Sequence, residues 1–256
     1  MNILLIGSNG RVGQLMVKTL EDKHNCTHLD LYPVENVTGR CIIGSVSDRK
    51  LMEEILQGFD SVIWLALGGG HTRYNDSHSA FDVNTRDWYW ILDRGIKAGI
   101  KHFIYISTMS VYHDFLNREF IDEDTPSDST DFYGISKLLA ELASQNVCSR
   151  FKDIVVLVYR LVAPYGVDEI SPFAKNESPK IRQMGSICLR ADELEDLYLR
   201  GLNFDQPGCH ILNTMGNYDQ NRFPTKKAEK LLGWTPKQKA NFQATDSNNH
   251  TTRKSE

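Results

Sequence analysis

The sequence has little of what marks a secreted, membrane-spanning or nucleic-acid-binding protein. Its 256 residues contain only five cysteines, an odd number with no CxxC spacing. That pattern indicates reduced, mostly buried thiols of a cytoplasmic protein and no metal site. No apolar run approaches the ~18 residues of a membrane helix, and no basic signal-like region precedes the first apolar residues. The formal net charge of −4 offers no attraction for nucleic acid or an anionic membrane, so we expect neither as a partner.

What the sequence does contain is a regular alternation of short apolar runs with longer amphipathic segments. This alternation predicts an α/β fold with a doubly wound parallel sheet. The predicted strands are residues 3–6, 27–31, 41–43, 61–65, 103–107, 154–159 and 210–213. The predicted helices are residues 11–20, 48–57, 81–98, 133–150, 191–203 and 226–232. Thr225 is the expected N-cap of the last helix and Gly233 its C-terminal stop.

The first predicted strand leads directly into a glycine-rich loop that opens the first helix. Gly7 permits a tight turn, Gly10 lets the backbone approach a pyrophosphate, and Gly13 lets the helix pack on the strand. The helix N-terminus offers N–H groups and a positive dipole end to phosphates. The loop therefore predicts a dinucleotide site. Its expected cofactor-binding residues are Gly7, Asn9, Gly10, Arg11, Val12 and Gly13.

An acidic residue near the end of the second predicted strand indicates which dinucleotide binds. Asp30 is 17 residues beyond Gly13, where a carboxylate can accept from both ribose hydroxyls of NAD and repel the 2′-phosphate of NADP. Leu31 and Tyr32 follow it, so no arginine is placed to bind that phosphate. We therefore predict NAD as the cofactor. An ordinary strand-end role for Asp30 is the alternative.

The most informative pair of residues lies further along the chain, in the run Tyr133-Gly134-Ile135-Ser136-Lys137. Four residues apart on a helix, the phenol and the ammonium share one face. A fixed positive charge beside a phenol favours phenolate and lowers the pKa of the tyrosine, which makes it an acid/base group usable near neutral pH. By itself this spacing is common. Downstream of a dinucleotide loop it predicts a catalytic site.

Together these motifs resemble the extended short-chain dehydrogenase/reductases, the NAD-dependent epimerase/dehydratase family, which includes sugar epimerases, dehydratases and uronate dehydrogenases. The resemblance covers about residues 1–238. Besides the glycine loop, Asp30 and the Tyr133/Lys137 pair, it rests on Ala66, Asn84, the run 106–112, Tyr159-Arg160 before Pro164-Tyr165-Gly166, and the run 231–236.

The resemblance implies a role for each matching residue. Thr108 would hydrogen-bond the reacting substrate oxygen, Tyr133 would transfer the proton, and Lys137 would hold the nicotinamide ribose. Asn84 would help to place water and Lys137. Ser45, Val46, Leu65 and Ala66 are implied cofactor contacts, and Met109, Ser110 and Arg160 implied substrate contacts. The alternatives are a strand-end cap for Thr108, an ordinary polar helix residue for Asn84, and an internal ion pair for Arg160.

The chain also departs from the family pattern. Ser45 stands where members often carry an aspartate that binds adenine, and Asp48 fits better as the N-terminal acid of the next helix. Trp64 replaces a common histidine and is expected in the core. Glycines 68–70 indicate a backbone close to the cofactor or a mobile lip.

The resemblance to the short uronate dehydrogenases suggests the function. An arginine corresponding to Arg160 would clamp the substrate carboxylate, although Met109-Ser110 stands where those enzymes carry Asn-His. We expect an NAD-dependent oxidoreductase of a small sugar or sugar acid. A sugar epimerase or dehydratase with tightly bound cofactor, and a non-catalytic nucleotide sensor, are the alternatives.

The predicted organisation has three parts. Residues 1–162 would form an NAD-binding Rossmann domain that carries the catalytic residues. Residues 163–238 would form a small substrate side with returning Rossmann elements, and 239–256 a disordered tail. Residues 71–79 and 113–130 are expected as loops. In the family that the chain resembles, the helices corresponding to 81–98 and 133–150 form the dimer interface, and the apolar Trp88–Leu92 stretch of the first predicts a homodimer. The alternative is that Trp88 or Trp90 covers the mouth of the active site.

Overall fold

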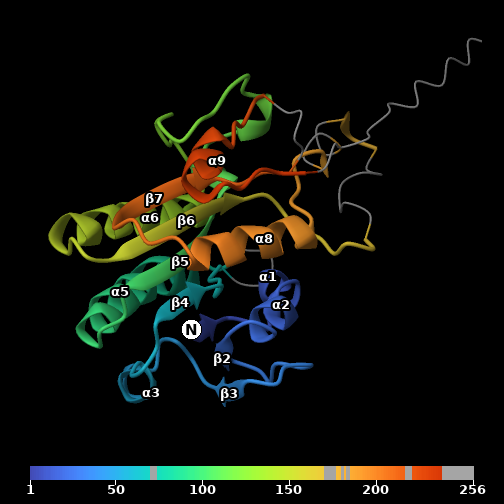
Figure 1. Cartoon of the computed structure of the whole chain (residues 1–256). Helices are drawn as coiled ribbons and strands as arrows, with labels where there is room; N and C mark the ends of the chain where they lie inside the picture. The colour runs from blue at the N-terminus through green and yellow to red at the C-terminus, as the bar shows by residue number, and fades with distance from the viewer. Residues whose placement is uncertain (70–73, 170–176, 180–181, 183–184, 217–220, 238–256) are drawn as a thin grey trace, which may run out of the picture.

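The computed structural model describes residues 1–69, 74–169, 177–179, 182, 185–216 and 221–237. Its centre is one parallel sheet of seven strands in the order β3-β2-β1-β4-β5-β6-β7, as Figure 1 shows. The predicted doubly wound α/β fold is confirmed. The strands are β1 (Asn2–Ile6), β2 (Asn25–Asp30), β3 (Arg40–Ile43), β4 (Ser61–Trp64), β5 (His102–Thr108), β6 (Val155–Leu161) and β7 (Gly208–Asn213).

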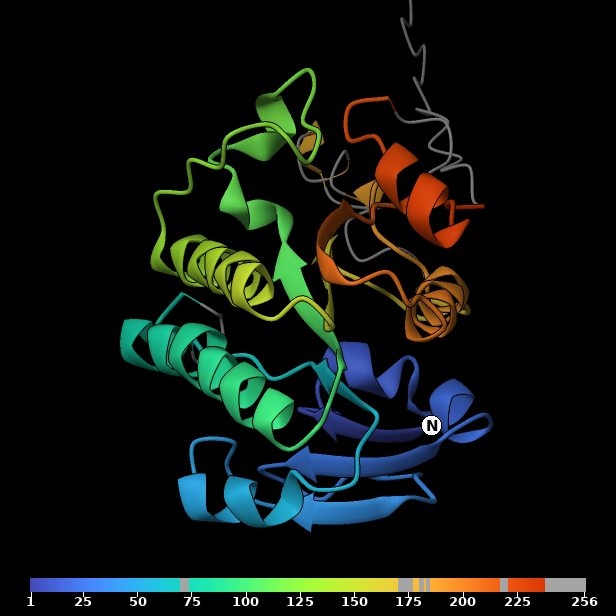
Figure 2. The same ribbon diagram turned by 60° about the vertical axis from the view of Figure 1, so that its left-hand side comes forward.

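Helices cover both faces of this sheet (Figures 1 and 2). On one face lie α3 (Arg49–Ile55), α5 (Trp88–Lys97) and α6 (Phe132–Arg150), whose apolar side chains pack against the sheet. On the other lie α1 (Arg11–Gln14), α2 (Val17–Glu21), α8 (Ala191–Leu202) and α9 (Lys226–Leu232). Because strands covered on both faces read as continuous apolar runs, the central strands were recognisable from sequence.

Two predicted helices are divided in the structure. Residues 11–20 form α1 and α2, separated at Leu15 and Met16, where Met16 has φ −135° and ψ −9° and lies in the core. Residues 81–98 form the end of α4 (Ser77–Phe81), the π-helical segment η1 (Asp82–Asp87) and α5. A π-helical turn is wider than an α-helical one and is found mostly at functional sites. Here it carries two buried polar side chains, Asn84 and Asp87.

Several local predictions are confirmed. Asp48 is the N-cap of α3 and accepts a hydrogen bond from the Leu51 N–H at 3.1 Å. Trp64 is fully buried. Gly233 ends α9 in the left-handed conformation, with φ 63°. Thr225 does precede α9, but its side chain makes no capping hydrogen bond there.

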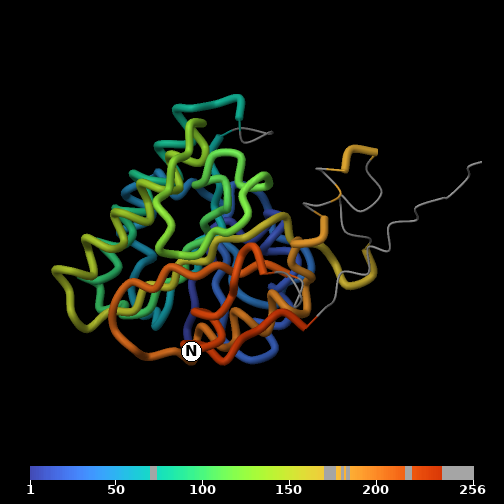
Figure 3. Tube along the Cα trace, turned by 90° about the horizontal axis from the view of Figure 1, so that it is seen from above, coloured from blue at the N-terminus to red at the C-terminus, as the bar shows by residue number. Residues whose placement is uncertain are grey.

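The two predicted loops contain short helices. In the segment 71–79, residues 71–73 lie outside the described residues. The helix α4 begins at Ser77, capped by Asp76, so the loop prediction was wrong for the last residues of the segment. The segment 113–130 contains the 3-10 turn η3 (Phe115–Asn117). Its Ile121 N–H donates to the Arg222 carbonyl at 2.8 Å, so it lies at the same end of the molecule as α9 (Figures 1 and 3). The predicted tail, 239–256, lies outside the described residues.

The elements after β6 complete the sheet. β7 pairs in parallel with β6, and the Trp234 indole N–H donates to the Glu193 carbonyl at 2.9 Å, which ties the residues after α9 to α8. The division into a part at 1–162 and a part at 163–238 stays a prediction. No helix of the described residues is long and apolar enough to cross a bilayer.

Candidate active site

Two adjoining cavities lie at the carboxyl ends of the strands, where doubly wound sheets bind ligands. One has a volume of about 460 Å³ and the other about 470 Å³. Gly10, Leu65 and Leu67 line both, so the two form neighbouring parts of one groove. The first contains the predicted residues Gly7, Asn9, Asp30, Ser45, Val46 and Ala66. The second contains Arg11, Val12, Thr108, Tyr133 and Lys137.

The glycine loop forms a cradle in which side chains have no room. Gly7 has φ +87°, and a Cβ there would lie 2.5 Å from the Ala66 nitrogen. A Cβ on Gly13 would lie 2.1 Å from the Ser8 carbonyl oxygen. The buried Ser8 hydroxyl is in turn 3.2 Å from Nδ1 of His28 on β2. The contact with His28 thus anchors the loop to β2. The loop backbone lies close to the space that a pyrophosphate would take.

Asp30 lines the first cavity next to the glycine loop. One carboxylate oxygen accepts from the Asn9 N–H at 2.9 Å, and the other from the Tyr32 N–H at 3.3 Å. A carboxylate beside a glycine cradle fits a dinucleotide with free ribose hydroxyls. Ser45 lines the same cavity, and its hydroxyl accepts from the Ser47 N–H at 3.1 Å. Lining residues that sequence reasoning missed are Ile6, Leu29, Leu31, Tyr32, Gly44, Leu67 and Val83.

Thr108, Tyr133 and Lys137 meet in the wall of the second cavity. Asp131 caps α6 by accepting from the Gly134 N–H at 2.8 Å, which fixes the helix turn carrying Tyr133. Lys137 is 2% exposed and its ammonium donates to the Ile106 carbonyl at 2.7 Å. The Thr108 hydroxyl caps the turn η2 (Met109–Val111), accepting from the Ser110 N–H at 3.1 Å.

Asn84 is buried next to this part of α6 and lies in the helical segment after the fourth strand, as expected. Its amide oxygen accepts from the Gly68 N–H at 2.9 Å and its amide nitrogen donates to the Ser136 hydroxyl at 3.0 Å. Asn84 therefore connects the loop after β4 with the α6 turn between Tyr133 and Lys137. A Cβ on Gly68 would lie 1.9 Å from the Ser79 carbonyl oxygen, so this loop also requires glycine.

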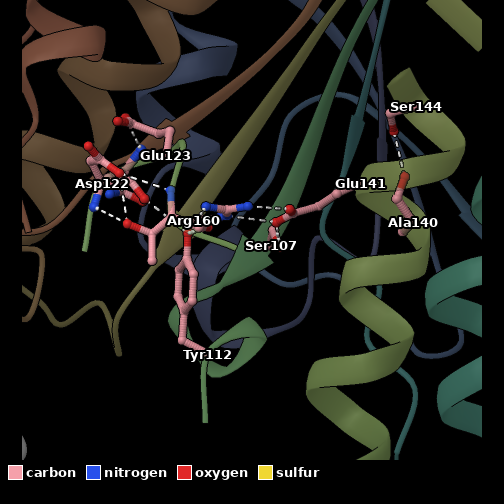
Figure 4. A network of polar contacts seen from close by, with 10 residues as sticks. Ser107, Tyr112, Asp122, Glu123, Ala140, Glu141, Ser144 and Arg160 are labelled. Atoms are coloured by element: carbon pink, nitrogen blue, oxygen red, sulfur yellow. Dashed lines mark hydrogen bonds and ion pairs between the residues drawn. The ribbon is translucent and has the colours of Figure 1, made fainter. Parts of the chain in front are cut away.

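Arg160 is not placed as a substrate clamp. It is 3% exposed and lines neither cavity. Its Nε and Nη2 donate to the two carboxylate oxygens of Glu141, at 3.0 and 2.6 Å, and its Nη1 donates to the Tyr112 hydroxyl at 2.5 Å (Figure 4). The internal ion pair, the alternative from sequence, is what the structure contains. The fork that would grip a carboxylate is already occupied.

The neighbours of Thr108 also differ from expectation. Met109 is fully buried in an apolar cluster with Val111 and Tyr112, so its side chain does not face the second cavity. Ser110 is half-buried and lines a separate cavity of about 180 Å³. Of the predicted substrate contacts, Thr108 alone is among the described residues that line the cavity of Tyr133 and Lys137.

Glu141 is the residue of this region that sequence reasoning missed. It accepts from the Ser107 hydroxyl at 2.5 Å as well as from Arg160, and so links α6 to both β5 and β6 (Figure 4). Burial alone would lower the pKa of Arg160; the hydrogen bond and charge of Glu141 outweigh it and raise that pKa. The available signal was its spacing, because Glu141 follows Lys137 by four residues and shares its helix face.

Sequence comparison with known proteins identifies the family of this chain. Residues 3–193 match the model of the NAD-dependent epimerase/dehydratase family. An N-acetylglucosaminyl-diphospho-undecaprenol 4-epimerase of Escherichia coli O157:H7 is 33% identical over 144 residues, 55% of this chain and 41% of that protein. A uronate dehydrogenase of Pseudomonas syringae pv. tomato is 22% identical over 245 residues, 92% of this chain and 81% of that protein. The match therefore spans less than half of the epimerase.

Solved structures share the fold. A glucuronic acid dehydrogenase from Chromohalobacter salexigens superposes with a TM-score of 0.77 at 17% identity, covering 94% of this chain and 85% of that one. At this identity the likeness concerns the architecture of sheet and helices.

Proposed function

This chain belongs to the NAD-dependent epimerase/dehydratase family, and we propose that it is an oxidoreductase that oxidises a small sugar or sugar acid with NAD. The observation that carries the proposal is the meeting of Thr108, Tyr133 and Lys137 in one cavity, next to the cavity that contains Asp30. The choice of a small substrate is supported by the uronate dehydrogenase relative, which matches this chain along most of both lengths.

In the proposed reaction Tyr133 takes the proton of the substrate hydroxyl, while the substrate carbon that bears this hydroxyl loses a hydride. NAD, when bound, supplies the acceptor for that hydride. The Lys137 ammonium favours the phenolate form of Tyr133, because an adjacent positive charge stabilises a negative one. Thr108 donates a hydrogen bond to the reacting oxygen and orients it toward Tyr133. Asn84 holds the α6 turn through Ser136.

Two arginines near the site, Arg11 and Arg160, are already in ion pairs. Arg160 is bound to Glu141, and Arg11, the arginine among the described residues lining the second cavity, pairs with Glu169. A substrate panel should therefore use matched pairs, each a neutral sugar and the uronate of the same configuration. Formation of NADH with either member supports the proposal. A carboxylate requirement appears as turnover of the acid alone.

The second candidate is an epimerase or dehydratase, which the E. coli relative favours by its higher identity. Such an enzyme returns the hydride to its substrate and forms no net NADH. We would find it as cofactor that co-purifies with the protein, together with product formation at constant NADH absorbance. A third candidate, a non-catalytic sensor, would bind NAD and give neither result. The presence of Thr108, Tyr133 and Lys137 in one cavity argues against it.

A further inference from the structure

The ammonium of Lys137 sits in an unusual environment for a charge. The residue is 2% exposed, and a cation removed from water requires compensating groups. One is the Ile106 carbonyl at 2.7 Å. Another is the aromatic face of Tyr105 on β5, whose ring centroid lies 4.6 Å from Nζ. The negative face of an aromatic ring attracts a cation within about 6 Å, and does so most strongly where water is excluded.

Tyr105 is itself fixed from two sides. It is fully buried, and its ring packs against Trp88 of α5 with centroids 4.7 Å apart. Its hydroxyl donates to the backbone carbonyl of Asn84 at 2.8 Å. That carbonyl belongs to the π-helical segment η1, whose Asn84 side chain holds Ser136 on α6. One side chain thus contacts both the charge of Lys137 and the turn that supports its helix.

We propose that Tyr105 is a positioning residue for the acid–base pair, whose ring face keeps the Lys137 ammonium charged and beside Tyr133. Its hydroxyl has a separate task, which is to hold the Asn84 turn. The inference rests on the proposed oxidoreductase function, because it concerns the same Tyr133–Lys137 pair. It goes beyond that function by assigning the tuning of the pair to a residue that touches neither substrate nor cofactor.

The other ionisable groups around this pair lie on several elements. Glu141 on α6 is neutralised by Arg160 on β6. Arg11 lines the same cavity as the pair and binds Glu169. On η1, which packs against α6, Asp82 pairs with Arg86 and Asp87 with Arg49. The Tyr74 ring lies edge-on to Tyr133, with centroids 5.5 Å apart. Burial raises the pKa of Tyr105 well above its ordinary value, so Tyr105 stays neutral while Tyr133 titrates.

The test is a titration of Tyr133 in the protein without substrate or cofactor. Tyrosinate has its own ultraviolet absorbance, and subtracting the same protein with Tyr133→Phe isolates one residue. We expect Tyr105→Leu, which removes the ring, to raise the midpoint of Tyr133 ionisation by about one pH unit or more. Tyr105→Phe keeps the ring and removes only the hydroxyl, so its midpoint should stay near that of the parent.

A second pair of variants separates the electrostatic effect of the ring from a general loss of stability. Pentafluorophenylalanine placed at position 105 keeps the shape of the ring but reverses the charge of its face, and should raise the midpoint as Tyr105→Leu does. Tyr159→Leu is the matched control: Tyr159 is equally buried but packs on the other face of the sheet, against Tyr198. It should lower stability and leave the midpoint unchanged.

Equal midpoints for Tyr105→Phe and the fluorinated protein, both folded by circular dichroism, would overturn the proposal. A purely structural Tyr105 gives that result, with loss of stability as the only effect. The titration needs no substrate, so its outcome is independent of the sugar panel. Absence of NADH formation in the panel contradicts the proposed function, whereas an unmoved midpoint contradicts the role of Tyr105.

Discussion

Tyr133 is the residue whose single oxygen the proposed chemistry depends on. Its ring is buried, at 4% exposure, so Tyr133→Phe should preserve packing and NAD binding. Turnover should fall by ~10²–10⁴, the usual contribution of general acid/base catalysis. Steady-state rates on the substrate found in the panel, together with calorimetric NAD binding, measure this. Normal turnover by Tyr133→Phe would show that Tyr133 has no catalytic role.

Thr108 is tested by two variants in the same assay. Thr108→Ser keeps the hydroxyl and should largely keep activity, whereas Thr108→Val removes the hydroxyl and should lose activity.

A second prediction at the residue scale is that Asp30 sets the choice between NAD and NADP. A 2′-phosphate would bring negative charge within hydrogen-bonding range of its carboxylate, at a cost of ~1–3 kcal/mol. We expect tighter binding of NAD than of NADP. Asp30→Asn keeps an acceptor for the Asn9 N–H and removes the charge, so the preference should fall by about tenfold. Titrations of both dinucleotides with both proteins check this. Equal affinities in the parent protein would contradict it.

At the scale of elements, the buried Glu141–Arg160 pair joins α6, β5 and β6. Both side chains are at most 4% exposed. Arg160→Met should destabilise the fold by about 3–5 kcal/mol, because it leaves a buried carboxylate without its cation. Urea unfolding measures this. Adding Glu141→Leu to the same protein should restore part of the loss, since the second change removes the orphaned charge. A loss below about 1 kcal/mol would show that water reaches Glu141.

His102 affects the acid stability of the whole molecule. It joins β4, β5 and α8, with Nδ1 3.0 Å from the Ser61 hydroxyl and Nε2 3.0 Å from the Gly201 carbonyl. Burial lowers its pKa from 6.5 to about 4. Between these values the unfolded chain binds a proton that the folded protein does not. Stability should therefore fall as the pH drops from about 6.5 to about 4, by at most roughly 3 kcal/mol from this group.

The control for His102 is His102→Gln, which has no titrating ring. Unfolding free energies of both proteins across this pH range give a difference curve. That curve should be flat above pH ~7 and change below it. A flat curve over the whole range would mean that His102 binds its proton at the same pH in the folded and the unfolded protein, and would contradict the lowered pKa.

The prediction of a homodimer also concerns the whole molecule. α5 and α6 lie side by side on one face (Figure 2). Along α4–α6 the exposed apolar side chains are Phe81, Tyr89, Leu139 and Leu142, exposed by 37–51%. Trp88, in contrast, is buried in the core and does not cover the active-site mouth. We expect light scattering to find a homodimer at micromolar concentration, and Leu142→Arg to shift it toward monomer. A monomeric parent protein would remove the prediction.

The sequence by itself determined the features that depend on neighbours along the chain. The central strands were visible as apolar runs, the cradle as three glycines, and the Tyr133/Lys137 pair as an i, i+4 spacing on one helix. Asp48 as a cap and Gly233 as a stop follow from the same local rules. Each rests on backbone geometry within a few residues, which composition and spacing encode directly.

Only the tertiary structure decided the features that depend on contacts between distant segments. Arg160 could have faced substrate or an internal acid, and Glu141, 19 residues away, made it internal. The π-helical turn at Asn84 is stabilised by partners on α6 and in the loop after β4, which no local pattern reveals. Met109 is buried because residues from both halves of the chain, such as Leu116, Val162 and Phe223, pack around it. Buried polar groups must find partners wherever the fold brings them, and that pairing is settled by the assembled structure.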